Sequence, residues 1–123
     1  MTTREQDESR EHRIMMEVVV DAYDDEEQAM GWYYYLDDKL TFPFRARCTR
    51  ERAASPLRIG EEVSVDRLAE EGDCRCEMVV LTTWQGRSLG LPLAQLDAVD
   101  ADEGTREAIG DWHYWVERGY GFG

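Results

Sequence analysis

The hydrophobic periodicity of this 123-residue chain changes at Pro43, and that change constrains its fold more than any other feature. Before Pro43, apolar side chains recur at helical spacing, at Ala29, Tyr33, Leu36 and Leu40. After it, Phe44, Ala46 and Cys48 alternate with polar residues, as expected of a half-buried strand. The sequence therefore predicts an α+β domain in which a helix precedes a sheet.

Four more short strands are predicted after this first one. They lie at Val63–Val65, over 76–82, over 88–93 and over 97–99. In the third strand the inward residues are predicted to be Cys76, Met78, Val80 and Thr82. A turn at Gln85-Gly86 joins the third and fourth strands, and one helical turn over 93–96 precedes the fifth. This meander order predicts a small five-stranded SH3-like β-barrel.

Helical segments are predicted to flank the barrel on both sides. The C-terminal helix runs from about Thr105 to Arg118, ends at Gly119 and turns three side chains toward the core: Ile109, Trp112 and Val116. On the N-terminal side, Asp24 and Glu27 form a capping pair that opens the aromatic helix, which is predicted to end near Leu40.

The first twenty residues are less sharply patterned. Residues 1–10 lack apolar periodicity and are predicted to be a disordered tail, so that 11–123 form the single domain. Residues 14–23 fit a helix through Ile14, Val18 and Ala22, although the run Val18–Val20 also suits a strand. We favour the helix.

The charge balance excludes several classes of function. Twenty-seven acidic residues face 14 basic ones, a net charge of −13 with a pI near 4.4. A polyanionic surface argues against binding nucleic acid or anionic lipid. No apolar run is long enough to span a membrane, and the N-terminus does not resemble an export signal. Three cysteines without such a signal favour reduced thiols, so we expect a cytoplasmic monomer.

Two aspartates at the end of the aromatic helix carry the first functional hypothesis. Asp37 and Asp38 stand where the unpaired carbonyls of a helix already leave partial negative charge. A bound cation would compensate that charge, and the sequence therefore predicts a hard-cation site here. The alternative is that both side chains are solvated and screened by salt.

Five strings of uncommon residues resemble the CcbP-like family of small bacterial calcium-binding proteins. They are Asp-Ala-Tyr at 21–23, Ala-Met-Gly-Trp-Tyr-Tyr-Tyr-Leu at 29–36, Phe-Pro-Phe at 42–44, Leu-Pro-Leu-Ala-Gln-Leu at 91–96 and Asp-Trp-His-Tyr-Trp at 111–115. The resemblance implies a calcium binder without an EF-hand that sequesters or senses cytosolic Ca²⁺.

Residue by residue, the same resemblance points to two acidic segments. The acidic position after the aromatic helix falls on Asp38. An acidic segment around a cysteine matches Glu71, Asp73, Cys74, Glu77 and Met78. The chain departs from the family pattern at Gly72 and Cys76, so the ligand set of that segment is not carried over in full.

Calcium prefers six to eight oxygen ligands, which clustered carboxylates and loop carbonyls supply. Glu71 and Asp73, in the turn before the third strand, are the expected partners of Asp37 and Asp38. Glu26 is a further candidate, although the acids of its cluster, 24–27, mainly suit a helix N-terminus.

The acidic run Asp97–Gly104 offers Asp100 and Asp102. It lacks the glutamate that closes an EF-hand loop, so it is at best an irregular calcium site. The alternative role for Asp102 is to cap the last helix.

Zinc binding and catalysis are the competing chemistries. Cys48, Cys74, Cys76 and His113 provide the residue types of a zinc site. However, Cys48 and Cys76 fall at the alternating positions that are predicted to face the core, which argues against a zinc site. No nucleophile motif accompanies His113, whose expected role is packing or hydrogen bonding, so we predict no enzymatic activity.

The sequence thus predicts a Ca²⁺-binding protein that captures the ion through surface carboxylates and communicates with a regulatory protein or protease. The alternative is an acidic SH3-like interaction module, or a nucleic-acid mimic, that engages a basic protein surface without specific metal binding.

Overall fold

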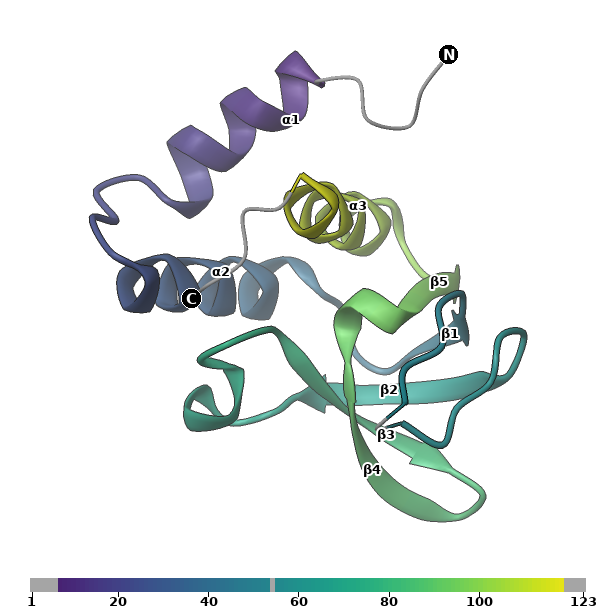
Figure 1. Cartoon of the computed structure of the whole chain (residues 1–123). Helices are drawn as coiled ribbons and strands as arrows, with labels where there is room; N and C mark the ends of the chain where they lie inside the picture. Colours follow the sequence, from purple (N-terminus) through teal and green to yellow (C-terminus); the bar gives the residue numbers. More distant parts are fainter. Residues whose placement is uncertain (1–6, 54, 119–123) are drawn as a thin grey trace.

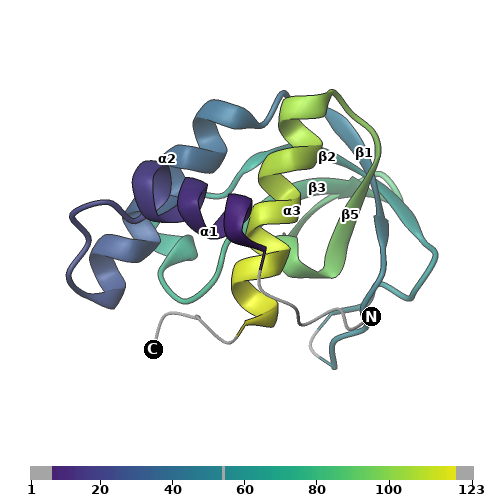
Figure 2. The same cartoon turned by 90° about the horizontal axis from the view of Figure 1, so that it is seen from above.

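The computed structural model describes residues 7–53 and 55–118, which form three layers (Figure 1). Helix α1 (Glu8–Arg13) and the π-helical segment η1 that continues it (Ile14–Val18) form the outer layer. Beneath them lie α2 (Asp25–Lys39) and α3 (Glu103–Glu117), which cover one face of the sheet. The view from above shows α1 crossing the space between α2 and α3 (Figure 2).

Five antiparallel strands form one sheet in the order β4-β3-β2-β1-β5. The strands are β1 (Phe44–Cys48), β2 (Glu62–Leu68), β3 (Val79–Trp84), β4 (Arg87–Pro92) and β5 (Leu96–Asp100). The α+β fold and the five-stranded meander are confirmed. Among the described residues no ladder joins β4 to β5, so the sheet is open and "barrel" is only a loose description.

The connections between the strands agree with the sequence pattern. Gln85 and Gly86 both have positive φ angles, of 51° and 75°, and close the tight hairpin between β3 and β4. This geometry matches the right-handed twist of the paired strands. The single 3₁₀ turn η3 (Leu93–Gln95) carries the chain across to β5.

The aromatic helix begins and ends as predicted. The Asp24 carboxylate accepts a hydrogen bond from the backbone N–H of Glu27 at 2.8 Å, which caps the first turn of α2. The helix ends at Lys39, and Leu40 returns to an extended conformation. The buried face of α2 is wider than the apolar positions at helical spacing predicted. Trp32 and Tyr35 are also buried, on the side of α2 that packs against the other helices.

Three tryptophans join the two central helices. The Trp32 ring lies 5.1 Å from that of Trp112 and 5.6 Å from that of Trp115, measured between centroids. Trp32 is fully buried, and tilted or edge-to-face contacts of this kind add to the stabilisation that burial provides. Ile109 and Trp112 face the core as predicted, whereas Val116 is only half-buried.

Two local predictions differ from the structure. Of the predicted disordered tail 1–10, residues 1–6 lie outside the described residues, whereas 8–10 belong to α1, which an ion pair between Arg10 and α3 holds in place. Cys76 is exposed rather than inward, because β3 begins only at Val79 and the alternation does not extend back into the preceding bend. The segment 14–23 is helical to Val18 and then turns, and the predicted stop at Gly119 lies outside the described residues.

No helix in the described part of the chain is long and apolar enough to cross a membrane.

Candidate metal centre

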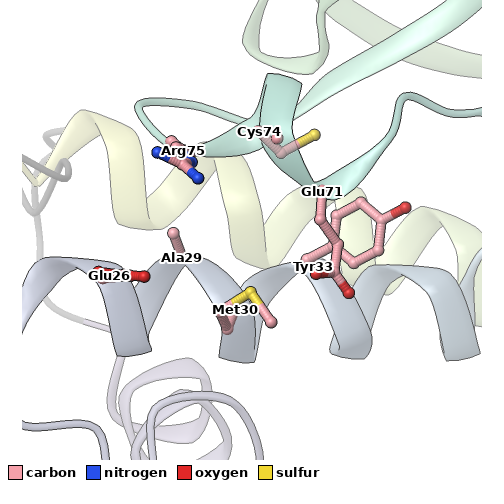
Figure 3. A pocket seen from close by; sticks show the side chains of 8 residues that line it. Glu26, Ala29, Met30, Tyr33, Glu71, Cys74 and Arg75 are labelled. Carbon is pink, nitrogen blue, oxygen red and sulfur yellow. The ribbon is translucent and has the colours of Figure 1, made fainter.

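A shallow groove of about 380 Å³ separates α2 from the 3₁₀ turn η2 (Glu71–Cys74) (Figure 3). Glu26, Met30 and Tyr33 line its α2 side, because residues spaced by three or four positions share one face of a helix. Glu71 and Cys74 line the other side. Glu71, expected to bind the same ion as Asp37 and Asp38, thus lies beside the helix that carries them.

Hydrogen bonds on both sides hold η2 in this position. The Tyr33 hydroxyl donates to the carbonyl of Ala69 at 2.8 Å, which ties the chain before η2 to α2. The buried Cys74 thiol is within hydrogen-bond range of both backbone groups of Val79, with Sγ 3.4 Å from the N–H nitrogen. Burial raises the pKa of this thiol, and its hydrogen bonds to Val79 fix η2 against the start of β3.

The Glu71 carboxylate is bound by a hydroxyl and not by a cation. Tyr34 donates its phenolic O–H to Glu71, and this hydrogen bond raises the pKa of the tyrosine. None of the ion pairs among the described residues includes Glu71. In the described part of the chain, therefore, no arginine or lysine forms an ion pair with this carboxylate.

Asp37 lies one helical turn beyond the groove. It follows Tyr33 by four positions and so shares its face of α2, but it is not among the residues that line the groove. Burial raises the pKa of Tyr33; electrostatic interactions with Cys74, Asp37 and Glu71 raise it further, and that with Arg67 lowers it. Both carboxylates thus affect the pKa of Tyr33. The sequence pattern did not single out Tyr33 and Tyr34 as residues of the site.

The remaining predicted ligands around η2 are less closely placed. Glu26 lies at the end of the groove away from Glu71, on the wall opposite Arg75 (Figure 3). Asp73 is exposed on η2 and does not line the groove. Asp38 is exposed on the last turn of α2, beside Asp37 in sequence.

Asp100 and Asp102 occupy a different part of the molecule. Asp100 ends β5, where it is paired with Arg45 in the β1–β5 ladder. Asp102 caps α3 by accepting a hydrogen bond from the N–H of Thr105 at 2.7 Å, and its other oxygen accepts one from the Thr41 hydroxyl at 2.8 Å. The hydrogen bonds from Thr105, and then that from Thr41, lower the pKa of Asp102. The capping role considered for Asp102 is confirmed.

The link through Thr41 also brings the N-terminus of α3 to the C-terminus of α2. A Cβ atom placed on Gly104 would lie 3.9 Å from the carbonyl oxygen of Lys39. The α3 N-terminus therefore lies close to the end of α2, but the Asp102 carboxylate that caps it already offsets its partial positive charge.

The predicted zinc ligands are not brought together. Cys48 is buried with its thiol donating to the Arg50 carbonyl at 3.1 Å, while Cys76 is exposed. His113 places Nε2 3.3 Å from the Leu93 carbonyl, the hydrogen-bonding role expected for it. In residues 7–53 and 55–118, no three His, Cys, Asp or Glu side chains converge in a ready-made metal cluster.

A fully buried carboxylate was missed by the sequence reasoning. Asp111 of α3 accepts hydrogen bonds from Arg10 at 2.7 Å, from Arg13 at 2.7 and 2.9 Å and from the Tyr35 hydroxyl at 2.7 Å. Its only signal in the sequence is its spacing from Ala108 and Trp115, which share its face of the helix. Asp111 anchors α1 and is unavailable to a metal.

The groove between α2 and η2 thus offers oxygen donors of the kind that Ca²⁺ prefers. Glu71 and Asp37 are anionic, lack cationic partners among the described residues and lie on two separate chain segments. Since the donors are not assembled in advance, an ion would have to draw them together and complete its shell with water and carbonyl oxygens.

Comparisons with known proteins agree with this chemistry. A family model named for CcbP and described as calcium binding matches residues 12–116. The crystal structure of Anabaena CcbP is 43% identical in sequence, covers 99% of this chain and 100% of its own, and superposes with a TM-score of 0.86. A solved calcium-binding protein in the calcium-binding form is 42% identical over the same shares of both chains, with a TM-score of 0.82. No curated protein matches the chain. The chain therefore belongs to the CcbP family of calcium-binding proteins.

Proposed function

We propose that this protein captures Ca²⁺ in the groove between α2 and η2, with Glu71 and Asp37 as the first ligands. The observation that carries the proposal is the difference between Glu71 and Asp111. The Glu71 carboxylate accepts a hydrogen bond from the Tyr34 hydroxyl, whereas the Asp111 carboxylate is bound by the guanidinium groups of Arg10 and Arg13. The carboxylates of Glu71 and Asp37 repel each other, and a divalent cation bound between them would lower their electrostatic energy.

Three neighbouring acids complete the proposed ligand set. Asp38 follows Asp37 at the end of α2, Asp73 follows Glu71 on η2, and Glu26 lies at the Arg75 end of the groove. Asp102 is left out because it caps α3, and Asp100 because it ends β5 and does not line the groove.

The physiological role we propose is reversible capture of cytosolic Ca²⁺, as a buffer or sensor, by a monomer. Ion binding would relieve repulsion between carboxylates and stabilise the folded state, and a regulatory protein or protease would detect that change. Three free cysteines, two of them buried, support a reducing compartment. We propose no catalytic step, because His113 is used in a hydrogen bond to the backbone.

Calorimetric titration of chelator-treated protein tests the proposal, with Ca²⁺ and Mg²⁺ compared at matched ionic strength. We expect saturable Ca²⁺ binding with much weaker Mg²⁺ binding. Glu71→Gln and Asp37→Asn should each weaken Ca²⁺ binding tenfold or more, about 1.4 kcal/mol.

Asp66→Asn is the matched control, since it removes one exposed charge from the sheet. It should leave the Ca²⁺ affinity within about twofold of the original, a change of roughly 0.4 kcal/mol. Equal and weak heats from both ions would refute calcium capture. Strong Ca²⁺ binding that survives both groove substitutions would refute the location and leave the family function in place.

A further inference from the structure

A second groove, of about 540 Å³, lies where the connection between η1 and α2 passes the first turns of α2. The connection stands at the edge of the helical layers in both views (Figures 1 and 2). Four side chains give the groove apolar walls: Val18, Val20, Ala22 and Met30. Its acidic lining comes from Asp21, Asp24, Glu26 and Glu27.

Hydrogen bonds hold the connection in a defined shape. The N–H of Ala22 donates to the Val19 carbonyl at 3.0 Å, around Asp21, whose φ angle is +60°. The N–H of Tyr23 donates to the Glu27 carboxylate at 2.9 Å. The groove is therefore formed before any partner arrives, which lowers the entropic cost of binding.

Apolar side chains in this segment are unusually exposed. Val20 is 51% exposed and Tyr23 is 86% exposed, and Met15 and Met16 of η1 are both more than half exposed. Methionine adapts its shape to different apolar partners. Exposed apolar side chains grouped beside a polar rim are typical of a protein interaction site.

The rim carries a high density of uncompensated negative charge. Five of the seven residues from 21 to 27 are acidic. Among the ion pairs of the described residues, none includes a member of this run. Asp24 and Glu27 accept backbone hydrogen bonds, which leave their charges in place.

We propose that the groove bounded by residues 18–31 is a docking site for a basic amphipathic helix of a partner protein. The apolar walls would receive one or two anchor side chains of that helix, and its Lys and Arg residues would face the acidic rim. The partner's charge follows from the rim, because phosphate-rich nucleic acid and anionic lipid would be repelled.

A second copy of this chain is a poorer occupant, because it carries the same net charge of −13 and four arginines on or just after β1 are already paired. Arg45 and Arg47 bind Glu62, Arg50 binds Glu117 and Arg52 binds Glu77. Docking these arginines on the acidic rim would require breaking existing ion pairs. The complementary surface therefore belongs to a different and basic protein.

Fluorescence anisotropy tests the proposal with a labelled peptide of leucine and lysine whose leucines lie on one helical face. Excess chelator is present throughout, so the result does not depend on the calcium proposal. We expect saturable binding, weakened at least tenfold in the double variant Val20→Ser/Met30→Gln. The rim variant Asp21→Asn/Glu26→Gln should weaken it by at least threefold.

Two matched variants distinguish the groove from the rest of the surface. Ile59→Ser removes an apolar side chain that is 64% exposed outside the groove, and Asp66→Asn/Asp97→Asn removes two charges from the sheet. Both should bind the peptide as the original protein does. Circular dichroism melting verifies that every variant is folded.

A peptide of the same composition with its leucines distributed around the helix supplies the decisive comparison. If it binds as tightly as the amphipathic peptide, the attraction is diffuse charge and the docking site is refuted. Undiminished binding by folded Val20→Ser/Met30→Gln protein would refute it equally.

Discussion

Two carboxylates on either side of α2, Asp111 and Glu71, show how differently this molecule uses the same chemical group. Asp111 is fully buried and accepts hydrogen bonds from two arginines and a tyrosine. Glu71 is exposed and accepts one hydrogen bond, from Tyr34. The first carboxylate is compensated inside the fold, whereas the second forms no ion pair with any described residue.

The comparison gives a criterion for this chain, which has 27 acidic residues and no EF-hand loop. A carboxylate that binds guanidinium groups stabilises the protein, and its negative charge is not available to a cation. A carboxylate without a cationic partner raises the electrostatic energy of the folded state until an ion binds. Substitutions at the two sites should therefore affect different measurements.

The largest expected effect is on the free energy of unfolding of Asp111→Ala. Removing this carboxylate leaves Arg10 with only the exposed Asp7 and Arg13 with only the exposed Glu107 as ion-pair partners, and breaking a buried ion pair costs about 3–5 kcal/mol. We expect the lower end of this range, because the two arginine side chains are 30% and 22% exposed and regain some solvation. Denaturant unfolding measures the difference.

The matched change at the other carboxylate is Glu71→Ala, measured without calcium. It should leave the free energy of unfolding within about 0.5 kcal/mol, as is usual for surface substitutions. If Glu71→Ala lowered the free energy of unfolding as much as Asp111→Ala does, the distinction between the two carboxylates would be wrong.

Gly31→Ala should have the next largest effect, by displacing the end of η1. A Cβ atom at this position would lie 2.2 Å from the carbonyl oxygen of Val18, a backbone atom that cannot rotate away. Overpacking of this kind costs about 1–3 kcal/mol. Gly72→Ala is the control, because a Cβ atom placed there would have nothing within 4 Å of it. Comparable melting temperatures for the two variants would contradict the close contact.

An arginine placed beside Glu71, like those that bind Asp111, should form an ion pair with Glu71 and so remove it from the proposed Ca²⁺ site. Tyr34→Arg replaces the hydroxyl donor with a guanidinium group, which competes directly with Ca²⁺ for the carboxylate. We expect calcium affinity to fall tenfold or more, about 1.4 kcal/mol, with no loss of stability. Tyr23→Arg adds the same charge at an 86% exposed position away from Glu71 and should change affinity much less.

Sequence patterns were sufficient for the fold because they reflect local preferences. Pro43 separates helix from strand, Asp24 caps α2, and Gln85-Gly86 closes the β3–β4 hairpin. The order of Asp7–Arg13 was not foreseen, since it depends on ion pairs between Arg10, Arg13 and a residue nearly one hundred positions away. Long-range pairing of this kind has no local signal.

The candidate site was predictable only in part, because local patterns indicate its acidic segments but not the tertiary contacts that bring them together. The acidic turn at Glu71 and the helix end at Asp37 were visible, but their juxtaposition rests on Tyr33, which binds the Ala69 carbonyl. The role of Tyr34 toward Glu71 depends on that tertiary contact and not on any motif. The location of Asp102 away from this groove likewise follows from how β5 leads into α3.

The smallest effect is expected at Asp102, a third kind of carboxylate that binds backbone and hydroxyl donors in place of cations. Hydrogen bonds from Thr105 and Thr41 lower its pKa in the folded protein below the unfolded value of about 3.9. A carboxylate with a lowered folded pKa stabilises the protein above the unfolded pKa, and that stabilisation is lost as pH falls through the folded pKa.

Asp102→Ala should therefore lower the melting temperature by a few degrees at neutral pH, where the charged cap is intact. The difference between the two proteins should shrink as pH falls below about 4, where the aspartate becomes protonated. Asp97→Ala provides the control, because Asp97 caps no helix. A difference that stays constant down to about pH 3, well into the range where aspartates protonate, would show that the charge of Asp102 contributes nothing to its capping of α3.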